Sequence, residues 1–255
     1  MGQLWINSDN TYLSVLVQGV TNGRPILLLP GFAEPKSDLA YWLTYLSNYL
    51  DDSGKFYMMQ ADLTGSGNSS GDISEISLEK LLADIETLLN YLAKNTGRKV
   101  TIVARGLSAA LCYTLYENEV IEKCIGVNPF ICGETERKRV IEKEDYLQIY
   151  DDNENKYIKS ILRFMGTEIT NIEGEKISVQ FLKAVLNYNW YDIYKRMNSK
   201  NKIIYLNSNS IFSYCNKEEY LTKSYLLAGY EEQSLIDDGE VLGNLIQMII
   251  NEIMK

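Results

Sequence analysis

The sequence is most informative at Val100-Thr-Ile-Val-Ala-Arg-Gly-Leu-Ser-Ala-Ala110, where an apolar run passes directly into a stretch of small residues. The first five residues have the composition of a buried strand, and residues 107–116 have that of a helix. The turn between them must therefore fall at Arg105 and Gly106. Glycine tolerates the unusual backbone angles that such an abrupt turn requires. We predict a strand, a tight elbow and a helix with no intervening loop.

Two stretches on the N-terminal side of this elbow have related patterns. Arg24-Pro-Ile-Leu-Leu-Leu-Pro-Gly-Phe32 is an apolar strand that ends in a tight turn, and Asp62-Leu-Thr-Gly-Ser-Gly-Asn-Ser69 is a D-x-x-G-x-G-x-S loop that follows another strand. Amphipathic helices are expected between these strands, at 39–50 and 77–93. Because strands and helices alternate with short connections, the strands are predicted to be parallel with right-handed crossovers.

These three motifs resemble the α/β-hydrolase family, in which the elbow reads G-x-S-x-G. The resemblance implies an α/β-hydrolase fold, with a mostly parallel eight-stranded sheet and helices on both faces. Residues 1–132 and 200–255 would form the core domain. Residues 133–199 would form a helical cap inserted over the active site.

The catalytic triad that the resemblance implies is degenerate. Gly106 occupies the nucleophile position, Ser210 that of the acid and Tyr230 that of the histidine, and the whole chain contains no histidine. A serine hydroxyl needs an adjacent base, and tyrosine, with an ordinary pKa of about 10, is a poor one near neutrality. A conventional Ser-His-Asp hydrolase is therefore excluded. A shifted register, Gly106-Leu-Ser-Ala-Ala110, would make Ser108 the nucleophile, but we favour Ser108 as a packing residue in the first helical turn.

The backbone part of the family's oxyanion hole needs no particular side chains. The resemblance assigns it to the N–H groups of Phe32 and Leu107, at a helix N-terminus that favours anions. Gly106 would enlarge the pocket beside it. Arg105 either adds a charge to this cleft or points away into a salt bridge. The predicted ligand-binding set is Phe32, Arg105, Gly106, Leu107, Trp190 and Tyr230, although Trp190 also suits core packing.

Composition excludes several classes of partner. The net charge of −9 would repel a phosphate backbone, so nucleic acid is not expected. No apolar run approaches the roughly 20 residues that span a bilayer, and no signal peptide is visible, so the protein is expected in the cytoplasm. The cysteines Cys112, Cys124, Cys132 and Cys215 show no C-x-x-C spacing, which predicts reduced thiols with no metal or other cofactor.

The sequence thus predicts a pseudoenzyme that binds a small acyl or carbonyl ligand or acts as a partner or scaffold subunit. The alternative is an enzyme of the same fold with non-triad chemistry. Such an enzyme would use the oxyanion hole with Tyr230, Glu231 or Arg105 for a lyase, isomerase or cyclisation step. Cys132, near the expected rim of the cleft, is a weaker candidate because, without a histidine, activation of its thiol would need an arginine or lysine nearby.

Overall fold

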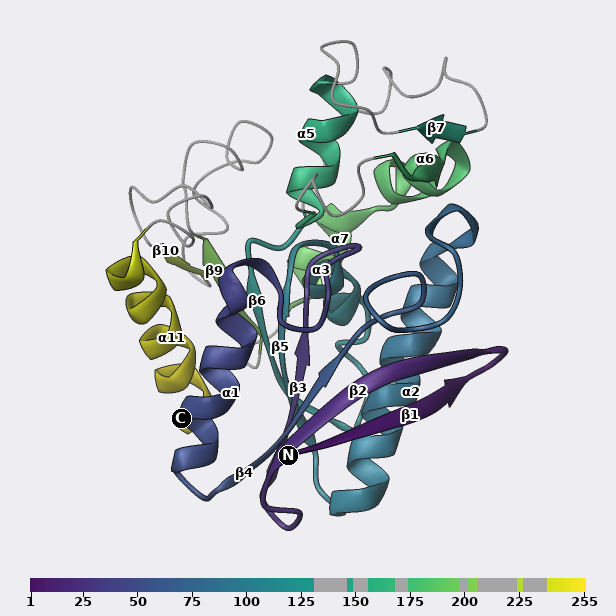
Figure 1. Ribbon diagram of the computed structural model, residues 1–255. Helices are drawn as coiled ribbons and strands as arrows, with labels where there is room; N and C mark the ends of the chain where they lie inside the picture. The colour runs from purple at the N-terminus through teal and green to yellow at the C-terminus, as the bar shows by residue number, and fades with distance from the viewer. Residues whose placement is uncertain (131–145, 149–155, 168–173, 198–200, 206–223, 227–237) are drawn as a thin grey trace.

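The computed structural model describes residues 1–130, 146–148, 156–167, 174–197, 201–205, 224–226 and 238–255. Within them, eight strands form one sheet in the order β1-β2-β4-β3-β5-β6-β9-β10 (Figure 1). The strands are β1 (Gly2–Ser8), β2 (Thr11–Gly19), β3 (Arg24–Leu29), β4 (Phe56–Ala61), β5 (Val100–Arg105), β6 (Ile121–Val127), β9 (Asn201–Tyr205) and β10 (Ser224–Leu226). The hairpin β1–β2 is antiparallel and joins β4 antiparallel, whereas every pairing from β4 to β10 is parallel. The predicted eight-stranded, mostly parallel sheet is confirmed.

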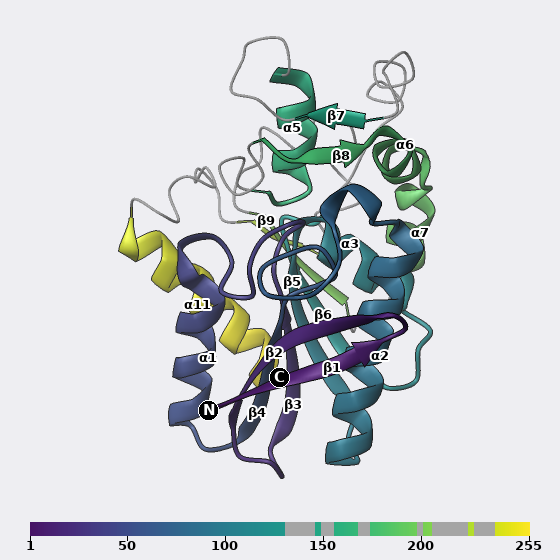
Figure 2. The ribbon, with the colours of Figure 1, turned by 45° about the vertical axis from the view of Figure 1, so that its right-hand side comes forward.

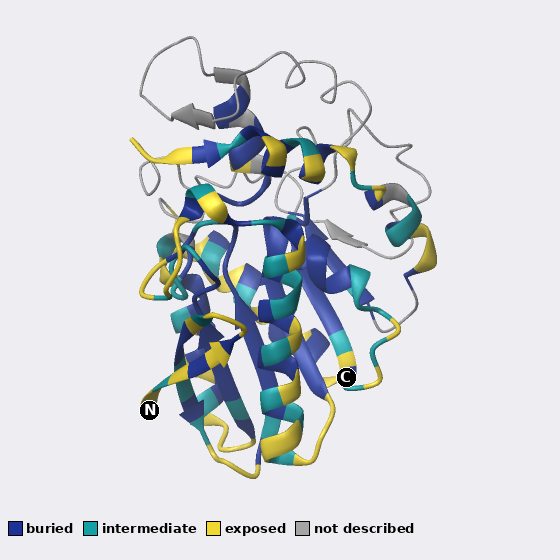
Figure 3. Ribbon diagram, turned by 90° about the vertical axis from the view of Figure 1, so that its right-hand side faces the viewer, coloured by how far each residue is buried: buried dark blue, intermediate teal, exposed yellow. Residues whose placement is uncertain are grey.

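Helices cover both faces of this sheet, because alternate side chains of its central strands point to opposite sides. On one face, Ile26 and Leu28 of β3 join the cluster that contains α1 (Trp42–Asp52) and α11 (Gly239–Met254). On the other, Leu27 and Leu29 join the cluster that contains α2 (Leu78–Thr96) and α3 (Gly106–Thr114). Figure 3 shows the strands buried between these two helix layers. Two short 3-10 helices, η1 (Leu39–Tyr41) and η2 (Ile73–Glu75), lie in the loops that follow β3 and β4.

Local signals account for most element boundaries. The Ser77 hydroxyl accepts a hydrogen bond from the Lys80 N–H at the start of α2, and Gly97, at φ 64°, ends it. The helix expected from Leu39 begins later, at Trp42, because Ala40 and Tyr41 have positive φ and so cannot continue a right-handed helix.

A second group of elements lies over the carboxyl ends of the parallel strands (Figures 1 and 2). It comprises α5 (Lys156–Phe164), α6 (Val179–Asn187), α7 (Trp190–Arg196) and a two-stranded antiparallel sheet of β7 (Tyr146–Gln148) and β8 (Lys176–Ser178). Ile161 and Leu162 of α5 and Leu182 of α6 belong to the same buried cluster as α2 and α3. This group therefore packs directly on the end of the sheet where the elbow lies. No helix in the described ranges combines the length and the apolar character needed to cross a membrane.

Candidate functional site at the elbow between β5 and α3

The elbow is formed as the sequence predicts. β5 ends at Arg105, and Gly106, the first residue of α3, has φ +54°. Ser108 lies within the first turn of α3 and is only 2% exposed. The left-handed backbone angle therefore falls at Gly106, in the position that the resemblance assigns to a nucleophile, and not at Ser108.

The N–H groups of Phe32 and Leu107 converge on one point, as an oxyanion hole requires. That point is the carbonyl oxygen of Met165, which accepts hydrogen bonds from the Phe32 N–H at 3.0 Å and from the Leu107 N–H at 2.9 Å. Met165 follows directly after the last residue of α5. The hole is thus assembled and is filled by a backbone carbonyl of the same chain.

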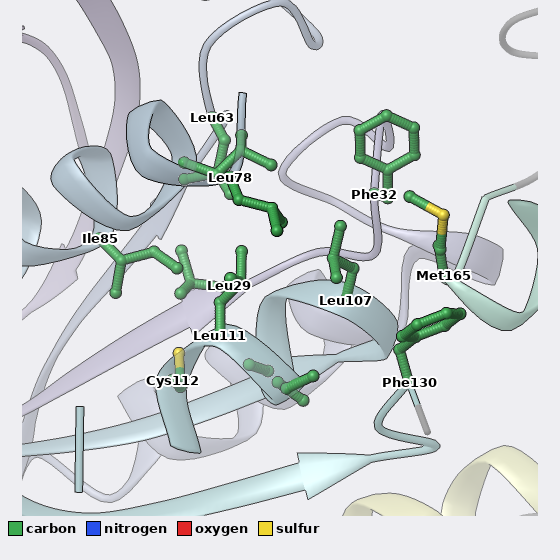
Figure 4. Packing of buried hydrophobic residues seen from close by; sticks show 14 of the residues in the cluster. Leu29, Phe32, Leu63, Leu78, Ile85, Leu107, Leu111, Cys112, Phe130 and Met165 are labelled. Carbon is green, nitrogen blue, oxygen red and sulfur yellow. The ribbon is translucent and has the colours of Figure 1, made fainter. Parts of the chain in front are cut away.

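Residues Met165, Gly166 and Thr167, which we call the strap, are held in this place by further hydrogen bonds. Nη2 of Arg105 donates to the Gly166 carbonyl (2.7 Å), and the Thr167 hydroxyl donates to the Phe32 carbonyl (2.8 Å). The N–H groups of Met165 and Thr167 bond back to the last turn of α5. All three residues are buried. The Met165 side chain belongs to the apolar cluster that includes Phe32 and Leu107 (Figure 4).

Three glycines allow the strap to approach this closely. A Cβ atom added to Gly106 would collide with the Met165 carbonyl and lie 2.8 Å from Cα of Gly166. A Cβ atom added to Gly31 would collide with the Gly166 carbonyl, and Gly166 itself has φ +86°. The expectation that Gly106 enlarges an open pocket is therefore wrong, because the strap fills the space that a side chain would have occupied. A serine at position 106 is incompatible with the strap where it lies.

The Arg105 side chain forms a buried ion pair, one of the two roles left open by the sequence. Its Nε and Nη2 atoms donate to the Asp38 carboxylate at 2.6–3.0 Å, and Arg105 is 2% exposed. Asp38 also accepts a hydrogen bond from Nε1 of Trp42 (2.9 Å) and has φ 58°. Because Nη2 also reaches the Gly166 carbonyl, the guanidinium joins the elbow, the loop before α1 and the strap.

The other predicted site residues lie elsewhere. Trp190 is 1% exposed, its Nε1 donates to the Val185 carbonyl (2.8 Å), and its ring packs edge-on against Phe130 at 6.0 Å. It therefore occupies a packing position. Tyr230 lies outside the described residues, as do Ser210, Glu231, Cys132 and Cys215.

A narrow cleft adjoins the filled hole. Gly31, Phe32 and Leu107 form part of its wall. The rest of the lining is mainly apolar, with a few hydroxyl groups: Ala33, Leu63, Thr64, Gly65, Ser66, Ile73, Ile76, Leu81, Ser108 and Leu111. Its empty space of about 310 Å³ includes its opening to solvent, and the enclosed part has room for about one water molecule.

The described residues offer little for a metal or a reactive thiol. No group of three or more histidine, cysteine or acidic side chains gathers in that part of the chain. Cys112 and Cys124 carry free, buried thiols. Burial, together with the neighbouring Cys112, raises the pKa of Cys124 well above its ordinary value, so its thiolate is disfavoured.

Sequence reasoning missed the strap entirely. Its only signal in the sequence is Gly166, which follows a helical stretch and is typical of a helix end. Nothing in the sequence indicates that the Met165 carbonyl next to it would enter the hole.

Comparison with known proteins identifies the architecture. No protein-family model and no curated protein matches the sequence. Among solved structures, the α/β hydrolase GrgF from Penicillium sp. sh18 superposes with a TM-score of 0.73 at 14% identity, over 98% of this chain and 96% of that one. DcsB, in complex with its substrate analogue, gives 0.72 at 13% identity over 99% and 98%. Est1E from Butyrivibrio proteoclasticus, with ferulic acid bound, gives 0.68 at 14% identity over 99% and 100%. The chain has the α/β-hydrolase fold.

Proposed function

We propose that this chain is a non-catalytic protein built on the α/β-hydrolase fold, which acts by binding a small molecule or a partner protein. One observation carries the proposal: the Met165 carbonyl occupies the two N–H groups that a hydrolase would offer to its substrate. This carbonyl lies beside Gly106, which has no side chain to attack it.

The chemistry of ester or amide hydrolysis requires a nucleophile, a base and a free oxyanion hole. Here the nucleophile position carries only a hydrogen atom, and the chain of 255 residues contains no histidine to serve as base. The hole contains an amide carbonyl in its ground state. Catalysis requires interactions that become stronger in the transition state. The two N–H groups already bond to a carbonyl that does not react, so a filled hole without a nucleophile supports binding rather than turnover.

The ligand that suits such a site is a small acyl or carbonyl compound, because its oxygen would accept the same two hydrogen bonds as Met165. A role as a partner or scaffold subunit would need no ligand there at all. We further propose a cytoplasmic location, which the free thiols of Cys112 and Cys124 support, since cytosolic proteins rarely carry structural disulfides.

Turnover measurements test the proposal. Purified protein incubated with nitrophenyl esters of increasing acyl length should release nitrophenol no faster than buffer. A fluorophosphonate probe should leave the chain unlabelled, and Ser108→Ala should behave as the wild type does. Labelling that disappears in Ser108→Ala would contradict the proposal and identify Ser108 as a nucleophile. Turnover that collapses in Tyr230→Phe or Glu231→Gln would instead favour the alternative, an enzyme with non-triad chemistry.

A further inference from the structure

The Met165 carbonyl accepts the two N–H groups of the hole as a ligand oxygen would, while the Thr167 hydroxyl and the buried Met165 side chain add further contacts that hold the strap in place. We propose that the strap is a displaceable latch. In the open state the site binds a short acyl compound, whose oxygen takes the place of the Met165 carbonyl and whose apolar chain enters the adjoining cleft. This inference rests on the proposed binding function and adds to it a means of regulation.

The donors in the hole match an acyl oxygen. The Phe32 and Leu107 N–H groups point at one acceptor, and Nη2 of Arg105 donates to the next carbonyl along the chain, that of Gly166. A ligand with an acyl oxygen presents an acceptor to the same cluster of donors. When the strap leaves, the buried N–H groups of Phe32 and Leu107 would lose their acceptor, so an incoming acceptor is favoured over an empty hole.

The cleft next to the hole supplies the second part of the site. Gly31, Phe32 and Leu107 lie beside the hole and also line the cleft, so the two adjoin. Ser108 also lines the cleft. Because the closed cleft has room for about one water, only a short chain fits, and only with some widening.

A ligand that displaces the strap from the hole would also move the end of α5. The Met165 N–H bonds to the Ile161 carbonyl and the Thr167 N–H to the Leu162 carbonyl, so the strap continues the last turn of α5. When the Met165 carbonyl is displaced, the C-terminal end of α5 must move with it. Ligand binding is thereby coupled to the position of the elements that cover the sheet.

Competition between strap and ligand gives a direct test. If only a fraction of the molecules is open, the apparent affinity is the affinity of the open state multiplied by that fraction. A change that weakens the strap increases the open fraction and therefore the apparent affinity. Thr167→Val removes the hydroxyl that bonds to the Phe32 carbonyl while keeping the shape of the side chain. Loss of one such bond should increase the apparent affinity for an acyl ligand about fivefold. Thr96→Val is the matched control, because its hydroxyl bonds to the Leu92 carbonyl at the far end of α2.

The probes are hexanoate and hexanamide, which share an acyl oxygen and distinguish a carboxylate from a neutral carbonyl. Hexylammonium has the same chain but no acceptor. Each is titrated into ¹⁵N-labelled protein while the Phe32 and Leu107 amide resonances are followed. We expect saturable shifts of both resonances with at least one acyl probe, tighter binding in Thr167→Val, wild-type affinity in Thr96→Val, and no such shifts with hexylammonium.

The latch is refuted if Thr167→Val binds the acyl probes no more tightly than Thr96→Val does, or if no probe shifts the two amides. That result would leave the absence of turnover intact. Conversely, turnover of a hexanoyl ester by the wild type would overturn the proposed function whatever the titrations show, so the two failures can be told apart.

Discussion

Gly106→Ala perturbs the elbow at its most constrained point. The added Cβ would meet the Met165 carbonyl, and φ of +54° is unfavourable for any residue with a side chain. The backbone angle costs about 1–2 kcal/mol. The Met165 carbonyl must also withdraw from two N–H groups, each hydrogen bond contributing about 0.5–1.5 kcal/mol. We therefore expect the free energy of unfolding to fall by about 2–5 kcal/mol in urea denaturation.

Two other glycines separate these contributions. Gly54 has φ +64° and nothing within 4 Å of an added Cβ, so Gly54→Ala should show the backbone cost alone, about 1–2 kcal/mol. Gly31 lacks a positive φ, but its added Cβ would meet the Gly166 carbonyl, so Gly31→Ala should show the cost of disturbing the strap alone. If Gly106→Ala proved no more destabilising than Gly54→Ala, the strap would not be seated in the hole and the reasoning from its contacts would be refuted.

Two further predictions concern buried groups. Asp38→Ala should destabilise the protein by about 3–5 kcal/mol, because it leaves the Arg105 guanidinium buried without its carboxylate. Asp38→Ala combined with Arg105→Met should cost less than the two single changes together, and strict additivity in chemical denaturation would contradict a direct coupling. Because the folded-state pKa of Cys124 lies above its unfolded value, the unfolded chain loses its proton first. Stability should therefore fall as pH rises above about 8.5, by up to about 1.4 kcal/mol per pH unit. Unfolding curves between pH 8 and 9.5 should show a shallower fall in Cys124→Ala, and an unchanged slope would contradict this origin.

The elements that follow from local sequence could be predicted. The strand and elbow at 100–110 depend on one apolar run and one glycine, and the limits of α2 depend on the cap residues Ser77 and Gly97. The start of α1 could not, because the positive φ angles at Ala40 and Tyr41 are imposed on residues that do not favour them. Sequence patterns indicate which backbone conformations residues prefer locally, so they cannot predict backbone angles that the tertiary structure imposes.

The presence of the Met165 carbonyl in the hole could not be predicted for a different reason. The Thr167 hydroxyl bonds to a carbonyl 135 residues away, and Arg105 pairs with a carboxylate 67 residues away. Contacts at such separations have no periodicity to detect. The strap is also recognised through a backbone carbonyl, which every residue possesses, so no side chain marks it. The resemblance correctly indicated which two N–H groups would converge, but it could not indicate that the chain itself would occupy them.

The strap also explains how the two buried N–H groups at the elbow are satisfied. Phe32 and Leu107 are 4% and 1% exposed, and a buried N–H group without an acceptor is costly. An active hydrolase must leave these donors to water or substrate. Once the side chain at position 106 is absent, the Met165 carbonyl can approach and satisfy both, and Gly31, Gly106 and Gly166 then pack backbone against backbone. The Met165 carbonyl thereby joins the C-terminal end of α5 to the two loops at the carboxyl end of the sheet.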